Sequence, residues 1–277
     1  MSVRTIPHAQ RRSSVVIHHL DCAPMRPLGG VPLVSHCLLV ATGSGLVLVD
    51  TGLGAADVSD PRRLGARFRH TMRPVLDLSR TAVHQIRALG YDPYDVTDIV
   101  VTHLDLDHAG GLADFPQARV HVTADEYRSA MRRDTRLEAN RYRPALWAHG
   151  VDWVVHSTAD SHWMGFPASR VLRGPDILLV PLPGHTRGHS AVAVQEPDRW
   201  LLHAGDAYFF HGEMDLRRPR CPRPMALHQR LVAEDHELRL TQLERLRELR
   251  RAHPRLIRFF SSHDAQEFAL LTSRDHY

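Results

Sequence analysis

The chain has 277 residues, of which 43% are hydrophobic and 24% are charged, and its formal charge is +4. This composition is typical of a globular protein and excludes a chain that is disordered throughout. The longest apolar runs fall far short of the roughly 20 residues that a membrane-spanning helix needs. The N-terminal residues lack the apolar core of a secretion signal, so we expect a soluble, cytoplasmic protein with no membrane partner.

The residue types exclude several kinds of site. Cys22, Cys37 and Cys221 form no CxxC pair, so neither a disulfide framework nor a thiolate zinc site is expected. The sequence contains no Lys, which excludes a lysine nucleophile. The Arg-rich segments lack interleaved aromatic residues, so no nucleic-acid partner is expected. The 21 His residues point to metal chemistry instead.

Apolar and β-branched runs predict strands, and helical apolar spacing predicts helices. In the first half, the pattern predicts strands over 15–20, 36–42, 46–50, 99–102 and 119–123, a hairpin turn at 43–45, and helices over 81–89 and 124–133. In the second half, it predicts strands over 176–181, 190–195, 200–203 and 256–260 and one long helix over 231–251. Strands and helices alternate twice without a linker, which indicates one two-lobed α/β domain over residues 1–277.

Two parts of this pattern leave alternatives open. The stretch over 140–169 shows no clear period and is interpreted as an insertion or lid-like region. Its Trp147, Trp153 and Trp163 either wall a pocket or attach the stretch to the core. The leucines of the long helix, Leu240 to Leu249, face either the chain's own sheet or a partner such as a second copy, so the oligomeric state stays open.

The segment after the strand over 99–102 concentrates possible metal ligands. Two imidazoles and two carboxylates occur within six residues, at His103, Asp105, Asp107 and His108. On an extended segment, residues 103, 105 and 107 would point the same way, with 108 approaching from the side. Imidazole and carboxylate groups suit zinc, iron or manganese, and four of them can hold up to two divalent ions.

Three further candidates lie where other predicted strands end. His185, Asp206 and His263 each follow an apolar strand. A site for two metal ions draws its ligands from several strand ends, so the shared placement of these three residues favours ligands over ordinary loop residues. The sequence therefore predicts a metal centre built from at least three loops.

Five short motifs together resemble those of the metallo-β-lactamase-fold hydrolase superfamily. They are VDTG at 49–52, HLDLDHAGG at 103–111, GHTRGHS at 184–190, GDA at 205–207 and SSHD at 261–264, in the order that the family has them. The resemblance implies an αββα four-layer sandwich with two metal ions at one edge, between the sheets. By the same resemblance, His103 and His185 bind the first ion, Asp107, His108 and His263 bind the second, and Asp206 bridges the two.

The resemblance also implies roles around the ligands. Asp50 would orient a ligand, and His189 would be structural. Asp105 departs from the pattern, because the family usually has a second histidine there. A carboxylate at this place resembles the flavodiiron-type proteins, and Asp105 either binds the first ion directly, binds it through water, or leaves that site weak. Zinc is the expected metal, with iron and manganese as alternatives that the extra carboxylate favours.

The implied activity is hydrolysis by a metal-bound hydroxide, with Asp107 among the catalytic residues. The chain resembles the lactonase-like branch in its length, in Met25-Arg26-Pro27 before the second strand and in its long helix. We therefore expect a small lactone or carboxylic ester as substrate; the alternatives are a thioester hydrolase and a di-iron oxygen-using enzyme. Those lactonases use a Tyr after the bridging Asp. Tyr208 is one residue short of that spacing, which Phe209 occupies, so Tyr208 is either catalytic or a core or pocket-wall aromatic.

Overall fold

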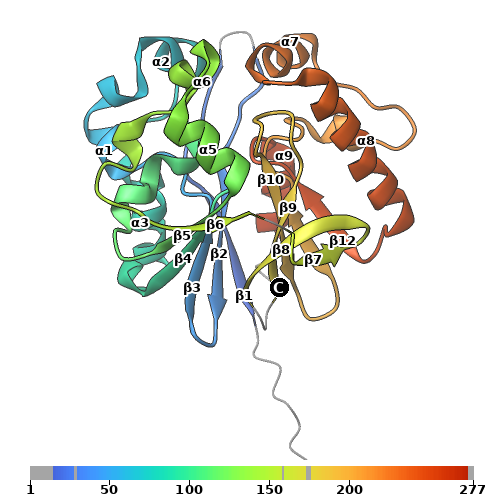
Figure 1. Ribbon diagram of the computed structural model, residues 1–277, viewed down its shortest axis with the longest axis horizontal. Helices are drawn as coiled ribbons and strands as arrows, with labels where there is room; N and C mark the ends of the chain where they lie inside the picture. The colour runs from blue at the N-terminus through green and yellow to red at the C-terminus, as the bar shows by residue number, and fades with distance from the viewer. Residues whose placement is uncertain (1–14, 28–29, 158, 173–175, 274–277) are drawn as a thin grey trace, which may run out of the picture.

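The computed structural model describes residues 15–27, 30–157, 159–172 and 176–273 (Figure 1). The first 14 residues, which belong to the segment searched for a secretion signal, lie outside this range. The described strands form two sheets of six strands each. None of the described helices is long and apolar enough to cross a membrane.

The first sheet follows the chain order from β1 to β6. Strands β1 to β3 are antiparallel, and β3 to β6 are parallel. The predicted hairpin turn joins β2 to β3, with Thr42 opposite Gly45. The strands are β1 (Val16–Asp21), β2 (His36–Thr42), β3 (Gly45–Val49), β4 (Val96–Val100), β5 (Arg119–Thr123) and β6 (Asp152–His156).

The second sheet has the order β12-β11-β10-β9-β8-β7. Its neighbours are antiparallel except β11 and β12, which are parallel. As a result, β9, β11 and β12 run in one direction and their carboxyl ends lie at one edge. The strands are β7 (Ser161–Trp163), β8 (Phe166–Leu172), β9 (Ile177–Pro181), β10 (Ser190–Gln195), β11 (Trp200–His203) and β12 (Ile257–Phe260).

Helices cover the outer face of each sheet, which gives four layers (Figure 1). The helices beside the first sheet are α1 (Ala55–Ser59), α2 (Ala66–Met72), α3 (Ala82–Ala88), α4 (Leu106–Ala109), α5 (Ala124–Arg132) and α6 (Arg136–Arg141). Those beside the second sheet are α7 (Arg223–Val232) and α8 (His236–Ala252). Helix α9 (Ala265–Thr272) packs against β1, and its Leu271 belongs to the cluster between the sheets. This arrangement is the predicted αββα sandwich.

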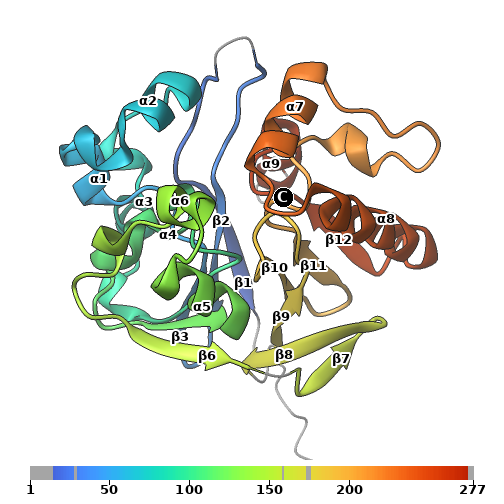
Figure 2. The same cartoon turned by 45° about the horizontal axis from the view of Figure 1, so that its top comes forward.

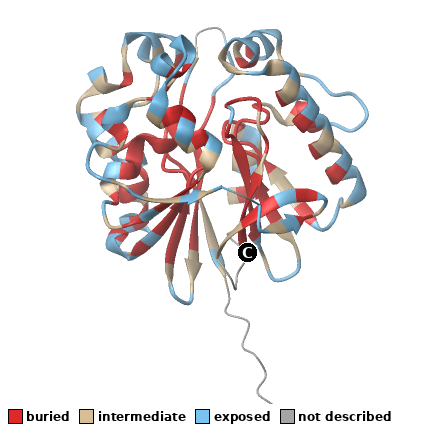
Figure 3. Cartoon of the chain, viewed as in Figure 1, coloured by how far each residue is buried: buried red, intermediate tan, exposed pale blue. Residues whose placement is uncertain are grey.

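The central strands are buried on both faces (Figure 3). Apolar side chains therefore pack in three places: between the two sheets, and between each sheet and its helices. Leu38 and Val49 belong to the cluster between the sheets, where they meet Leu179 and Val192 of the second sheet. Their neighbour Leu39 belongs to the cluster under the helices of the first sheet. Successive side chains on a strand point to opposite faces, so a strand covered on both faces is apolar throughout.

The expectation of an irregular stretch over 140–169 is wrong, because this stretch contains β6, β7 and the start of β8. Figure 2 shows β6 and β8 along the lower edge, where the chain passes from the first sheet to the second. Both β6 and β7 are edge strands, and none of the five residues of β6 is fully buried, so the strand lacks a regular apolar pattern. That the stretch acts as a lid stays a prediction.

The tryptophans of this stretch pack on the core. Trp153 makes edge contacts with Tyr127 and Trp147, and all three lie against the cluster under the first sheet's helices. Trp163 is buried against Trp200 in the cluster of the second sheet. These contacts agree with the interpretation that the aromatic residues attach the stretch to the core.

The single helix predicted over 231–251 is two helices. Helix α7 ends at Val232, and α8 begins after Asp235, whose side chain caps it by accepting a hydrogen bond from the backbone N of Leu238. A local cap outweighs the continuous helical period here. Leu243, Leu246 and Leu249 are buried in the cluster of the second sheet, and Leu240 is 38% exposed. The leucine face therefore covers the chain's own sheet.

Candidate metal centre

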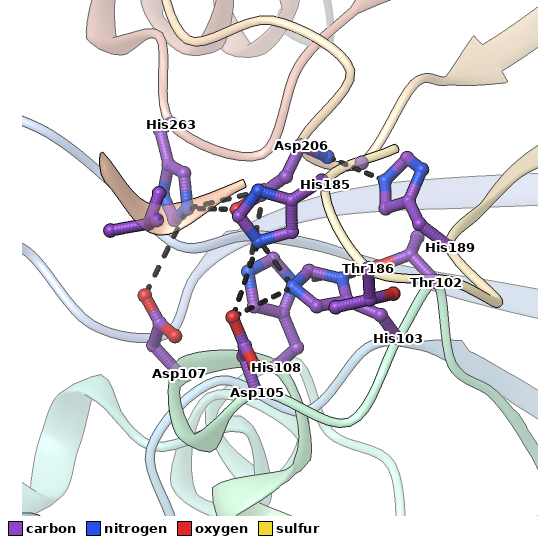
Figure 4. Close-up of polar contacts among 12 residues, drawn as sticks. Thr102, His103, Asp105, Asp107, His108, His185, Thr186, His189, Asp206 and His263 are labelled. Atoms are coloured by element: carbon purple, nitrogen blue, oxygen red, sulfur yellow. Dashed lines mark hydrogen bonds and ion pairs between the residues drawn. The ribbon is translucent and has the colours of Figure 1, made fainter. Parts of the chain in front are cut away.

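The predicted ligands come together where strands of both sheets end (Figure 4). His103 follows β4 of the first sheet, and Asp107 and His108 lie on α4 just beyond it. From the second sheet, His185, Asp206 and His263 follow β9, β11 and β12. The parallel direction of these three strands explains why loops far apart in the sequence meet at one edge.

The segment 103–108 is not extended throughout. Asp105 is the N-cap of α4, and Asp107 and His108 lie within this single helical turn. The turn, rather than strand alternation, therefore directs Asp107 and His108. The following Gly110 has an ordinary helical φ of −60°, and its role is close packing: a Cβ would lie 2.8 Å from the carbonyl oxygen of Gly52. A glycine at this position therefore permits the close approach of two chain segments.

The ligand atoms form three overlapping groups, each within 4.8 Å: His103, Asp105 and His185; His103, His108 and Asp206; Asp107, His108 and His263. One oxygen of Asp206, Oδ2, lies 3.4 Å from His185 Nε2 and 3.8 Å from His103 Nε2. Its other oxygen, Oδ1, lies 3.4 Å from His108 Nε2 and 3.2 Å from His263 Nε2. Because Oδ2 also lies 3.3 Å from His263 Nε2, the carboxylate as a whole lies between the imidazoles of the two sides, as a bridging ligand does.

Asp105 and Asp107 complete the two sides. Asp105 Oδ2 lies 3.2 Å from His185 Nε2 and 3.5 Å from His103 Nε2. Asp107 Oδ2 lies 3.8 Å from His263 Nε2. The structure therefore brings together all seven predicted ligands, including Asp105.

The buried atoms of this cluster fit divalent cations. His103 Nε2, His108 Nε2 and Asp206 Oδ1 are buried and have no hydrogen-bond partner in the described structure. Leaving buried polar atoms unpaired costs about 1–3 kcal/mol each, so such atoms call for a bound partner. Imidazole nitrogens and carboxylate oxygens are the ligands that zinc, iron and manganese take.

Burial and charge set the protonation of the cluster. Burial lowers the pKa of His185 to about 4, which keeps its imidazole neutral, the form that binds a metal. Burial would also lower the pKa of His108, but the carboxylates of Asp206 and Asp50 raise it to about 10. Conversely, burial would raise the pKa of Asp206, but His263 and His108 hold it well below its usual range. Without a cation, the carboxylates are therefore balanced by imidazolium.

Asp50 is bonded to His108, one of the predicted ligands, in agreement with the orienting role that the resemblance implied. Its Oδ2 pairs with Nδ1 of His108 at 2.9 Å. It also accepts hydrogen bonds from the backbone N and the hydroxyl of Thr102, at 2.7 and 2.8 Å. These bonds fix the imidazole so that its Nε2 faces Asp206.

His189 is a structural residue at the edge of the cluster. Its Nδ1 pairs with the carbonyl oxygen of Leu182 at 2.8 Å, and its Nε2 accepts a hydrogen bond from the backbone N of Asp206 at 2.8 Å. Both ring nitrogens are occupied, so His189 holds the backbone of Asp206 and has no free nitrogen for a metal.

Two residues of the site were missed by the sequence analysis, Glu126 and Arg141. The fully buried Glu126 accepts hydrogen bonds from the backbone N of Leu104 at 2.8 Å and from the hydroxyl of Thr186 at 2.6 Å. It thereby joins the loops that carry His103 and His185. Arg141 lies beside Asp105. Both residues lie on short helices outside the five motifs, where a charged residue is ordinarily exposed to solvent, so the sequence offered little indication of their role.

The structure does not bring Tyr208 to the ligands. Its side chain is fully buried, and its hydroxyl donates to the carboxylate of Glu267, at 3.1 and 3.2 Å from the two oxygens. Phe209 lies beside the ligands instead, with its ring 4.6 Å from that of His263 and 6.1 Å from that of His185. Of the two alternatives for Tyr208, the geometry favours the core aromatic.

A family model of the Metallo-beta-lactamase superfamily matches residues 30–252. The chain belongs to this superfamily, and its fold and ligand cluster are those of a metallo-hydrolase. The protein described as "Probable metallo-hydrolase Rv2300c" from Mycobacterium tuberculosis is 44% identical over 258 residues, which cover 92% of this chain and 82% of that protein.

Two further matches are named as lactonases. "N-acyl homoserine lactonase AttM" from Rhizobium radiobacter is 30% identical over 161 residues, 58% of this chain and 59% of that protein. A solved structure of an N-acyl homoserine lactone hydrolase, with the product N-hexanoyl-L-homoserine at its catalytic metal center, matches with a TM-score of 0.71. It covers 93% of this chain and 96% of that chain at 21% identity, which shows a shared fold.

Proposed function

We propose that this chain is a dinuclear metal-dependent hydrolase that opens a lactone or cleaves a small carboxylic ester. The observation that carries the proposal is the position of Asp206, whose carboxylate lies between His103 and His185 on one side and His108 and His263 on the other. The names of the partial lactonase relatives support the choice of substrate class. The proposed metals are two Zn²⁺ ions, with iron and manganese as the alternatives.

The proposed ligands follow the two sides of the cluster. His103, Asp105 and His185 hold the first ion, Asp107, His108 and His263 hold the second, and Asp206 binds both. When bound, the two ions supply an acidified water molecule and an electrophile for a carbonyl oxygen. Side-chain exposure supports an approach from the side of Asp105 and Asp107, which are 19% and 12% exposed, against at most 4% for the other five.

Residues of the chain carry the remaining steps. Asp107 lies on the open side, where its carboxylate accepts the proton of the attacking water and returns it to the leaving alkoxide. Phe209 supplies an apolar surface beside His185 and His263 that excludes water from the reacting ester. The product is a hydroxy acid, or an acid and an alcohol.

The test is the metal content of protein purified without added metal, followed by turnover of a panel of lactones, esters and thioesters. We expect about two zinc or manganese ions per chain and turnover of a lactone or ester. Iron without hydrolysis would support the oxygen-using alternative, for which the three carboxylates at 105, 107 and 206 argue. Turnover of thioesters alone, or a chain without metal, would also contradict the proposal.

The substitution Asp206→Ala tests the bridging role most directly. We expect loss of turnover by at least about a hundredfold and loss of one or both metal ions, because the carboxylate that lies between the two sides is removed. Asp198→Ala, which removes a 73% exposed carboxylate, is the matched control and should keep both properties. An Asp206→Ala chain that retains two ions and full turnover would refute the bridging role.

A further inference from the structure

Asp105 has a buried cationic neighbour that the motif alone does not reveal. The Nε of Arg141, on α6, lies 3.4 Å from Asp105 Oδ1, while Asp105 Oδ2 faces His103 and His185. The two oxygens of the carboxylate therefore have different partners. Among the described residues, Oδ1 forms an ion pair with the guanidinium without a hydrogen bond, and Oδ2 faces the ligand group.

The Arg141 side chain is held at several points. It is 7% exposed, and its guanidinium donates to the backbone carbonyl oxygens of His185, at 2.9 Å, and of Val232. The same cation thus contacts the backbone of one proposed ligand and the side chain of another. Helix α6 is itself fixed by a capping box, in which Thr135 and Glu138 exchange hydrogen bonds at its first turn.

The contact between Arg141 and Asp105 offsets part of the negative charge of the proposed ligand set. Asp105, Asp107 and Asp206 together bring three negative charges to the proposed ligand set, one more than a set with an imidazole at position 105. An additional carboxylate that is largely removed from water is costly unless a cation pairs with it. Arg141 offsets that charge from the side opposite to His103 and His185, without occupying a ligand position.

We propose that Arg141 is a positioning residue that makes Asp105 a ligand of the first metal ion. Its positive charge attracts Oδ1, which favours the orientation in which Oδ2 points at the site shared with His103 and His185, and it offsets the charge that the carboxylate adds. Asp105 and Arg141 therefore act as one unit, in place of a single imidazole. This inference rests on the proposed metal-dependent function.

A double-mutant cycle tests the unit, with Arg141→Met, Asp105→His and the double variant. Zinc affinities are measured by competition with a chromophoric chelator, and the ligand field is measured from the visible spectrum of the Co²⁺-substituted proteins. In the wild-type background, we expect Arg141→Met to lower the zinc affinity of the first site about 10- to 100-fold. The zinc affinity of the second site should stay within threefold of its wild-type value. In the Asp105→His background, the same change should alter the affinity less than threefold.

Controls separate this role from a structural one. Arg143→Met removes a nearby guanidinium that bonds the backbone of Arg63, and it should leave both zinc affinities within threefold. Because Arg141 also bonds backbone carbonyls, its Met variant can fail to fold. In that case Arg141→Lys replaces Arg141→Met in the double-mutant cycle. The lysine keeps the positive charge but lacks the planar set of N–H donors, so it should lower the zinc affinity of the first site only when Asp105 is present.

Two results would overturn the inference. An equal loss of affinity in both backgrounds would mean that Arg141 supports the loop of His185 alone. A Co²⁺ spectrum unchanged by Arg141→Met would mean that Asp105 is not oriented by it. If wild-type protein binds two ions but the cycle shows no coupling, only the Arg141 inference fails; a wild-type chain that binds no metal refutes the proposed function as well.

Discussion

At the scale of single residues, burial decides which polar groups next to the metal centre are free to react. Tyr208 and Phe209 are neighbours in the chain, yet only the ring of Phe209 lies beside His263 and His185. The Tyr208 hydroxyl is bonded to Glu267, and its side chain has no exposed surface. A hydroxyl in that position has its hydrogen bond in the core and is turned away from the proposed ligands.

Tyr208→Phe is therefore expected to affect stability and to spare catalysis. Loss of one buried hydrogen bond should lower the free energy of unfolding by about 1 kcal/mol, with kcat and KM within about twofold of the wild-type values. Tyr94→Phe, at a 72% exposed tyrosine, is the matched control and should change neither quantity. A kcat lowered tenfold or more in a folded Tyr208→Phe protein would assign the hydroxyl to the reaction.

Glu267 predicts a pH dependence of stability. Burial, and then the nearby charge of Asp264, raise the pKa of its carboxyl to about 8, above the value of 4.5 expected in the unfolded chain. The folded state therefore holds this proton more tightly. The contribution to stability is complete below pH 4.5 and is lost as the pH rises through 8.

Glu267→Gln removes this titration and keeps the hydrogen-bonding shape. We expect the variant to gain stability over the wild-type chain by about 1 kcal/mol more at pH 8 than at pH 5, after allowance for screening by solvent. Denaturant unfolding at the two pH values measures the difference. A gain that is the same at both would show that Glu267 is ionised in the folded state from pH 5 upward.

At the scale of elements, the site depends on how closely the loop after β9 approaches helix α5. A Cβ built on Gly188 would overlap the backbone N and Cα of Glu126. Glu126 in turn bonds Thr186 and the backbone N of Leu104. The close backbone contact and the two hydrogen bonds of Glu126 thus hold the loop of His185 next to the segment after His103.

Gly188→Ala should therefore damage both stability and metal binding. Backbone atoms cannot move aside as a flexible side chain can, so we expect a loss of about 3 kcal/mol or more and at least a tenfold weaker zinc affinity. Gly90→Ala is the control: its Cβ would meet nothing within 4 Å, but its φ of +87° should still cost about 1 kcal/mol. Equal effects of the two changes would mean that backbone strain, and not the close approach, matters at Gly188.

At the scale of the whole molecule, the proposed ligands connect the two halves of the sandwich. His103, Asp105, Asp107 and His108 follow a strand of the first sheet, and His185, Asp206 and His263 follow strands of the second. A cation bound to both sets would link the two halves at the edge where the strands end. Metal binding should then stabilise the fold as a whole.

Chelation tests this link. Removal of the metal is expected to lower the thermal midpoint of unfolding by several degrees, because a ligand at a thousandfold excess over its Kd contributes about 4 kcal/mol. Differential scanning calorimetry with and without chelator measures the shift. The Asp206→Ala chain serves as the control and should show little change, whereas equal midpoints for the wild-type chain in both conditions would contradict the link.

The sequence by itself determined what depends on short segments. Strands such as His36–Thr42 and Arg119–Thr123 were predicted at their observed bounds, because alternation and β-branched residues act within a few positions. The candidate ligands that follow such strands, Asp105 among them, could be proposed from the same local pattern. The weakly apolar edge strands within 140–169 and the cap at Asp235 were missed, since edge exposure and a single capping bond barely alter the period.

Only the tertiary structure decided which distant residues meet. Arg141 contacts Asp105 across 36 positions, and Tyr208 turns to Glu267 while its neighbour Phe209 faces the ligands. These contacts depend on how helices pack on the sheets and on which side of a loop a side chain emerges. No local spacing carries that information, because burial and pairing arise only when segments far apart in the chain exclude water together.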